Sequence, residues 1–388
     1  MSDKPLYVTE PALPPLEQFE PLLREIWASR RLTNGGPYHD QLEAALAAYL
    51  AAPQVSLLAN GTLALMLALK ALEVEGEVIT TPYSFVATTH ALVWSGCTPV
   101  FADIDPVSLN LDPAAVEAAI TPRTRAILAV HVYGRPCDTA GLQAVADRHG
   151  LRLIYDAAHA FGVQLDSGSL MAAGDAAILS FHATKVFHTF EGGAIVCRDE
   201  ALKARIDLLR NFGFKGETRV LATGINAKMN ELQAAFGCLT LGSIDSEIAA
   251  RAAIAARYRA AFAPLAGLRL LSGLPGVARH NHGYYPVFID AGFPLDRDAL
   301  YTRLREQGII AREAAIGIDT AARAERAKNL VEKLPGMAED CELPQAQITR
   351  VLGADLEEEA AALSDHHLEQ RGRRLRRQPR RAARRRPA

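Results

Sequence analysis

A lysine, Lys185, lies within a polar stretch, Ser180–Gly193, that joins two short apolar runs. The runs are Ala176–Leu179 and Ala194–Cys197, and four apolar residues bounded by turn residues are typical of a buried strand. An amine held between two buried strands is partly desolvated. Desolvation lowers the pKa of an amine and makes it a nucleophile for Schiff-base chemistry. The alternative is a lysine on a surface loop, which describes most lysines, so other parts of the chain must decide.

A second chemical pattern is Asn60-Gly61-Thr62, which follows the apolar run Val55–Leu58 and precedes the apolar run Leu63–Leu72. These runs predict a strand and a helix. The free N–H groups and the positive dipole end of a helix N-terminus bind phosphate, and a threonine hydroxyl adds a donor. Alternatively, Asn60 or Thr62 caps the helix and has no ligand.

A third pattern is Asp156 with His159, directly after the apolar run Leu151–Tyr155. An aspartate at the end of a strand is either the N-cap of the next helix or the anionic partner of a cationic ligand. A lone histidine is most simply a buried core residue. Three residues after an acid at a strand end, His159 is also a candidate for the site.

The elements that must position these residues alternate between strand and helix. Periodicity and turn residues predict strands at 77–81, 99–102, 125–131 and 284–289, and helices at 16–29, 38–50, 86–95, 113–120, 139–149, 231–241, 248–262 and 297–306. Strands separated by single helices predict a mostly parallel sheet flanked by helices on both faces. Ligands bind beyond the carboxyl ends of such strands, where Asn60–Thr62, Asp156 and Ser180 all fall.

Composition narrows the class of protein. The chain has 388 residues, 49% hydrophobic and 22% charged, which is ordinary for a folded globular protein. Its net charge is −2, but the last eighteen residues hold ten arginines and no acids, so the first 370 carry −12. An acidic body argues against a nucleic-acid-binding surface. No run reaches the ~20 apolar residues of a membrane helix.

Cysteine usage and the N-terminal sequence both point to the cytoplasm. Five scattered cysteines form no CxxC pair, which favours reduced packing residues. The acidic, proline-rich N-terminus has no signal-peptide core. We therefore expect a cytoplasmic protein that binds neither membrane nor nucleic acid.

Seven ordered blocks resemble the DegT/DnrJ/EryC1/StrS family of sugar-nucleotide aminotransferases. The resemblance covers about residues 30 to 310, and its blocks are LTNGGP (32–37), NGTLAL (60–65), TPYSFVAT (81–88), DIDP (103–106), DAAHAFG (156–162), SFHATKVFHTFEGG (180–193) and GINAKMNELQAA (224–235). The resemblance implies a pyridoxal-phosphate (PLP) enzyme of fold type I, the aspartate-aminotransferase fold. In that α/β fold, a large domain with a mostly parallel central sheet is followed by a smaller C-terminal α/β domain.

The family pattern also implies a role for each matching residue. Lys185 holds the cofactor as a Schiff base and carries the proton, and Asp156 pairs with the pyridine nitrogen. The other matches lie around the cofactor: Gly61, Thr62 and Ser180 at its phosphate, Phe85 against its ring, His159 near its ring hydroxyl, and Asn226 at the phosphate of a neighbouring subunit's cofactor. The last of these implies a homodimer with the active site at the subunit interface. No metal is expected.

The block around Lys185 resembles family members that aminate the 4-keto group of a nucleotide-linked 4-keto-6-deoxyhexose, with glutamate as donor. Members acting on the 3-keto group are the alternative, and so is a non-catalytic regulator acting through the arginine-rich tail. A dehydratase branch with histidine in place of the lysine is disfavoured by Lys185. A metal hydrolase using His131, His159, His182 and His188 is disfavoured because their spacings match no helical ligand pair.

Four regions follow from these patterns. We expect an N-terminal arm (1–30), a large PLP-binding domain (31–245), a small C-terminal domain (246–370) and a disordered tail (371–388). The chain departs from the family after residue 312, where Glu313–Asp319 reads EAAIGID and lacks the Tyr-, Phe- and Pro-rich segment of many relatives.

Overall fold

A computed structural model describes residues 5–7 and 9–311, which all belong to one unit. The predicted arginine-rich tail and the divergent segment at 313–319 lie outside the described residues. The predicted small domain is described only as far as residue 311.

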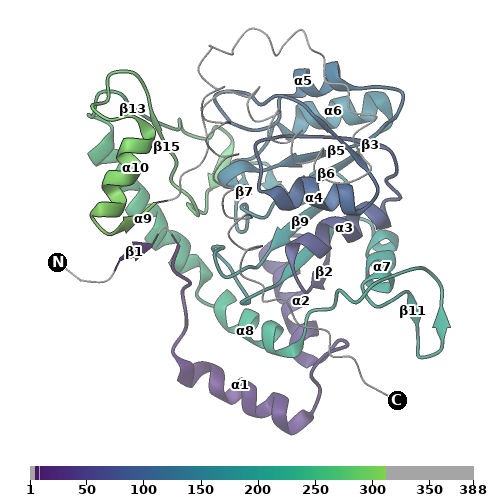
Figure 1. The fold of residues 1–388 in the computed structure, drawn as a ribbon. Coiled ribbons are helices and arrows are strands. Elements are labelled where there is room, and N and C mark those ends of the chain that lie inside the picture. The colour runs from purple at the N-terminus through teal and green to yellow at the C-terminus, as the bar shows by residue number, and fades with distance from the viewer. Residues whose placement is uncertain (1–4, 8, 312–388) are drawn as a thin grey trace, which may run out of the picture. The chain divides into compact units, whose positions relative to one another are not determined.

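A seven-stranded sheet forms the centre of this unit (Figure 1). Its strands, in spatial order, are β2 (Gln54–Leu58), β10 (Gly193–Cys197), β9 (Ala176–Ser180), β6 (Arg152–Asp156), β5 (Thr124–Val130), β3 (Glu77–Thr80) and β4 (Thr98–Phe101). The pairs from β9 to β4 are parallel. Strand β10 is antiparallel to both of its neighbours, β9 and β2. The expected mostly parallel sheet is confirmed.

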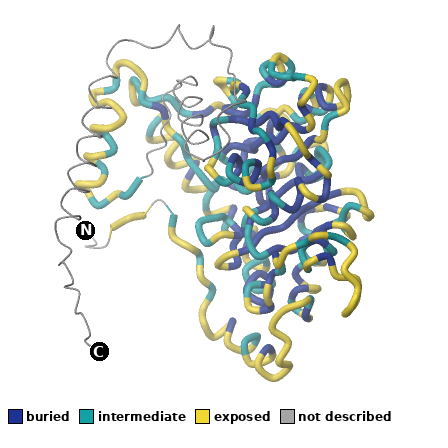
Figure 2. Tube along the Cα trace, turned by 45° about the vertical axis from the view of Figure 1, so that its right-hand side comes forward, coloured by how far each residue is buried: buried dark blue, intermediate teal, exposed yellow. Residues whose placement is uncertain are grey.

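Helices cover both faces of the sheet because the strands are apolar on both faces. In β5, Ile127 and Ala129 pack in one core cluster, whereas Ala126 and Leu128 pack in the other. One face carries α3 (Gly61–Ala71), α4 (Val86–Trp94) and α7 (Glu200–Leu209); the other carries α2 (Pro37–Tyr49), α5 (Pro113–Ala119), α6 (Thr139–His149), α8 (Glu231–Leu241) and the start of α9 (Ile244–Phe262). The strands of the central sheet are accordingly buried along most of their length (Figure 2).

Short elements surround this core. Helix α1 (Leu16–Ser29) packs on α8 through Phe19 and Ile26. The remaining elements are β1 (Leu6–Tyr7) with β16 (Ile309–Ile310), β7 (Gln164–Leu165) with β8 (Gly168–Ser169) and β14 (Val277–Arg279), β11 (Phe214–Lys215) with β12 (Arg219–Val220), β13 (Leu268–Leu270) with β15 (Val287–Ile289), and α10 (Arg297–Glu306).

The predicted elements agree with the structure to within a residue or two at most boundaries. Helix α3 begins at Gly61 rather than Leu63, because the Asn60 side chain accepts a hydrogen bond from Leu63 N and caps the helix there. Helix α9 begins at Ile244 rather than Ile248. The strand predicted at 284–289 covers only Val287–Ile289, so Tyr284 stays outside it.

Two properties expected from composition can be compared with the structure. Cys97, Cys137 and Cys197 are buried free thiols, as expected of packing residues, and Cys341 lies outside the described residues. In the part of the chain that the structure describes, no helix is long and apolar enough to cross a bilayer.

Burial in the two core clusters predicts where truncation destabilises the fold. Leu128 is completely buried in β5, so Leu128→Ala should lower the free energy of unfolding by about 2–5 kcal/mol, because it leaves a cavity between sheet and helices. Leu265 is 44% exposed, and Leu265→Ala should change it by less than about 0.5 kcal/mol. Urea unfolding followed by circular dichroism measures both, and equal losses would contradict this assignment of the core.

Candidate active site

Three of the predicted motifs meet at the carboxyl edge of the central sheet. Asp156 ends β6 and Ser180 ends β9, and these strands are parallel neighbours in which Asp156 is paired with Ile178. Strand β2 is parallel to β9, since each is antiparallel to β10, and so Asn60 follows β2 at the same edge. The shared strand direction therefore brings together residues that are 120 positions apart in the sequence.

The N-terminus of α3 packs closely on Ser180. A Cβ built at Gly61 would lie 2.9 Å from Ser180 Cβ, and one built at Gly193 would lie 2.7 Å from Asn60 O. Only glycines permit these approaches. The Asn60 side chain engages Leu63 N, whereas the N–H groups of Gly61 and Thr62 lie in the first turn, where a helix provides no acceptor. With the Ser180 hydroxyl beside them, these donors form a cradle suited to a phosphate.

Asp156 is buried, with 6% of its surface exposed. Its Oδ2 accepts a hydrogen bond from Thr88 Oγ1 (2.8 Å), and its Oδ1 accepts one from Ala158 N (3.1 Å). Burial raises the pKa of the Asp156 carboxyl; the two hydrogen bonds and the positive charge of Lys185 offset part of this rise. Such a carboxylate is stabilised by any further cation that reaches it.

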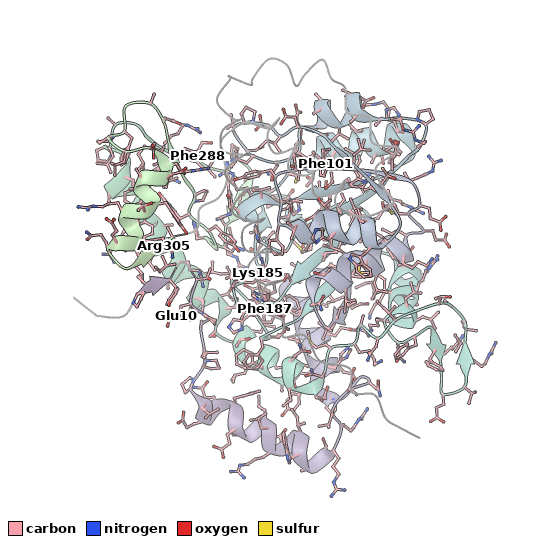
Figure 3. The ribbon with its side chains drawn as sticks, viewed as in Figure 1. Glu10, Phe101, Lys185, Phe187, Phe288 and Arg305 are labelled. Atoms are coloured by element: carbon pink, nitrogen blue, oxygen red, sulfur yellow. The ribbon has the colours of Figure 1, made fainter. Side chains whose placement is uncertain are left out.

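Lys185 lies in a turn of the connection between β9 and β10, where its N–H donates to His182 O (2.8 Å) (Figure 3). Two phenylalanines anchor this connection. Phe181 and Phe187 are almost fully buried, with ring centroids 4.9 Å apart, and Phe187 stacks on Phe161 at 4.5 Å. The anchored turn places Lys185 in the wall of a small pocket that also includes His159.

His159 is half-buried and belongs to an aromatic cluster. Its ring centroid lies 4.5 Å from that of Tyr284 and 6.4 Å from that of Tyr133, whose ring is nearly parallel to it. The hydroxyls of Tyr133 and Tyr83 are hydrogen-bonded at 2.6 Å. His159 is thus not a core histidine but part of the pocket beside Lys185.

Three other predicted site residues, Phe85, Thr62 and Asn226, are exposed to solvent. Phe85 is 72% exposed at the N-cap of α4, the helix whose Thr88 bonds to Asp156. Thr62 is exposed in the first turn of α3, next to Gly61. Asn226 is exposed in a segment that forms a bridge with Asn211.

Sequence reasoning missed a fourth segment of the site, Asn281–Tyr284. Asn281, Gly283 and Tyr284 line the same pocket as Lys185 and His159. The run HNHGYYP (280–286) was a usable signal, because it is polar and aromatic and lacks the alternation of the strand predicted there.

The four histidines considered for a metal site are dispersed. His131 is fully buried and stacks on Tyr155, His188 is buried against Phe236, and His182 faces Glu191. Within residues 5–7 and 9–311, no group of three or more His, Cys, Asp or Glu side chains is placed to hold a metal ion.

Comparisons with known proteins agree on one family. The model of the DegT/DnrJ/EryC1/StrS aminotransferase family matches residues 16–336. A dTDP-4-amino-4,6-dideoxy-D-glucose transaminase of Shigella dysenteriae is 50% identical over 311 residues, covering 80% of this chain and 84% of that protein.

Two solved structures extend this agreement to the fold. DesI, solved in the presence of its TDP-sugar product, is 38% identical with a TM-score of 0.79, covering 90% of this chain and 86% of that one. NtdA of Bacillus subtilis, solved with the cofactor PMP bound, is 31% identical with a TM-score of 0.69, covering 75% of this chain and 67% of that one.

The burial of Asp156 predicts that the folding stability of the ligand-free protein depends on pH. Because the folded state raises the pKa of this carboxyl, the unfolded state releases its proton first, and ionisation of Asp156 lowers stability as pH rises above the ordinary value of 3.8. Asp156→Asn removes that charge, and its amide can still bond to Thr88. The melting temperature of ligand-free Asp156→Asn should exceed that of the ligand-free parent, with a gap that widens as pH rises and levels off above the raised pKa. A gap that narrows with rising pH would contradict the assignment.

Proposed function

The chain belongs to the DegT/DnrJ/EryC1/StrS aminotransferase family, and we propose that it transfers an amino group from glutamate to C4 of a dTDP-linked 4-keto-6-deoxyhexose. It is a PLP-dependent aminotransferase with the α/β fold of that family. The observation that carries the proposal is the meeting of three motifs at one edge of the sheet. These are the lysine at 185, the buried carboxylate at 156 and the glycine–serine cradle at 61 and 180.

The residues at this edge fit the cofactor at both of its charged ends. The cradle of Gly61, Thr62 and Ser180 suits the phosphate, because the first-turn N–H groups have no acceptor within the helix and the absence of a Cβ at Gly61 lets Ser180 approach them. Asp156 suits a protonated pyridine nitrogen, because its carboxylate is buried and its raised pKa reflects a charge that lacks full compensation. When bound, PLP supplies an electron sink for the substrate carbon.

Lys185 and His159 act beside the cofactor in this proposal. Lys185 provides the amine that binds the cofactor and then carries the proton to and from the substrate carbon. Its positive charge favours the ionised form of Asp156. His159 would lie toward the ring hydroxyl, and Phe85, exposed at the start of α4, would pack on the ring face.

A homodimer completes the site. Asn226 is exposed in the segment that forms a bridge with Asn211, and its exposed side chain is available to the cofactor phosphate of a second copy. We place the enzyme in the cytoplasm, where the buried thiols of Cys97, Cys137 and Cys197 remain reduced.

The choice of the 4-keto position is supported by the Lys185 block and by the named reaction of the Shigella relative. The experiment is to incubate the purified enzyme with PLP and glutamate in two separate reactions. One reaction contains a dTDP-linked 4-keto-6-deoxyhexose, and the other contains the 3-keto isomer. Carbon-13 NMR of the product should show nitrogen at C4. Nitrogen at C3 would replace the proposal with the 3-keto alternative, and no amination of either sugar by glutamate would overturn it.

Lys185→Ala tests the proposed catalytic amine. The variant should still bind PLP through the cradle and Asp156, but turnover should fall by at least about 10²–10⁴-fold, the range lost with a positioned proton-transfer group. Borohydride reduction of the parent followed by peptide mapping should label the peptide that contains Lys185. A labelled Lys203 or Lys228, or turnover retained by the variant, would show that another amine does this chemistry.

A further inference from the structure

Asn281 is a buried polar residue to which neither motif nor family pattern assigned a role. It follows β14, has no exposed surface, and lines the pocket that contains Lys185 and His159. A carboxamide buried at this depth must have its donors and acceptor satisfied, and its partners therefore define what it holds.

The two N–H donors of Asn281 hold the loop that follows Asp156. Nδ2 donates to His159 O at 2.8 Å and to Phe161 O at 2.9 Å. These bonds fix the backbone of His159 from a segment that lies about 120 residues further along the chain. Gly134 lies close to this hydrogen bond: a Cβ built at Gly134 would be 2.6 Å from His159 O and 3.0 Å from Asn281 Oδ1.

The acceptor of Asn281 holds the opposite wall of the pocket. Oδ1 accepts a hydrogen bond from Gly283 N at 3.1 Å, which fixes the turn that leads directly into Tyr284. The ring of Tyr284 lies 4.5 Å from that of His159. One amide therefore sets both members of the His159–Tyr284 ring pair.

We propose that Asn281 is a positioning residue of the active site, which sets His159 and Tyr284 against each other beside Lys185. The inference rests on the proposed function, because it assigns His159 to the cofactor. Without the two donors, the carbonyls of His159 and Phe161 are left buried and unpaired, and the loop relaxes to satisfy them. A displacement of about 1 Å at a reacting group costs about a hundredfold in rate.

Asn281→Asp isolates this role. It keeps the size of the side chain and an acceptor for Gly283 N, but it places a carboxylate oxygen against the two carbonyls. We expect kcat to fall about a hundredfold. The dissociation constant of PLP, titrated into ligand-free protein, should rise about tenfold, corresponding to ~1.4 kcal/mol. The visible circular dichroism of bound PLP should weaken.

Glu77→Gln is the matched control. Glu77 is also buried and hydrogen-bonded, to Thr121 and Arg123, but it begins β3 at the opposite edge of the sheet. It should lower the melting temperature and leave PLP affinity and the visible signal unchanged. Gly134→Ala, which pushes on His159 O and Asn281 Oδ1, should reproduce the Asn281→Asp effect, and it replaces that variant if Asn281→Asp does not fold.

The outcomes separate the two proposals. Suppose that the parent binds PLP and aminates the sugar, but that Asn281→Asp matches Glu77→Gln in both PLP affinity and visible signal. Asn281 is then only structural, and the inference fails while the proposed function stands. Gly134→Ala is judged in the same way if it replaces Asn281→Asp. If the parent takes up no PLP, the proposed function fails and the inference fails with it.

Discussion

The site depends on the burial of one carboxylate. Asp156 loses most of its hydration at the end of β6 and regains only part of that stabilisation from Thr88, Ala158 N and the charge of Lys185. The bonds to Thr88 and Ala158 N require α4 and the loop after β6 to hold their places. The Asp156 carboxylate is incompletely stabilised in the free protein. It therefore favours binding of a cationic ligand, whose positive charge provides the missing stabilisation.

The reversed strand β10 explains how Lys185 reaches this carboxylate. Because β10 runs antiparallel to β9, the chain between them must turn over the carboxyl edge of the sheet, where Asp156 ends its strand. Phe181 and Phe187 anchor that turn in the core, so the lysine sits on a rigid base. Gly193, the first residue of β10, then allows Asn60 and the start of α3 to approach.

The central sheet and most of the site could be predicted because their signals are local. Asn60, Asp156 and Ser180 lie at or just after the carboxyl ends of apolar strands, and parallel strands that end at the same edge bring such residues together. The run HNHGYYP (280–286) marks the segment of Asn281 and Tyr284 as polar and aromatic, but it does not reveal which residues the segment contacts. The place of these two residues depends on hydrogen bonds to His159 and Phe161 formed across the fold, and the strand expected at 284–289 concealed them. Nothing in the local pattern encodes a bond of that range.

The electrostatics of the edge restrict the shape of its ligand. The first turn of α3 favours an anion, whereas Asp156 favours a cation, and Ser180 and Asp156 end neighbouring strands. Parallel strands lie about 5 Å apart, so the two preferences act on opposite ends of a group about 5–10 Å long. A compact cation that carries a phosphate satisfies both, whereas a simple anion or cation satisfies only one. Once such a ligand provides the cation that faces Asp156, the charge of Lys185 is no longer needed there, and its amine is available for reaction.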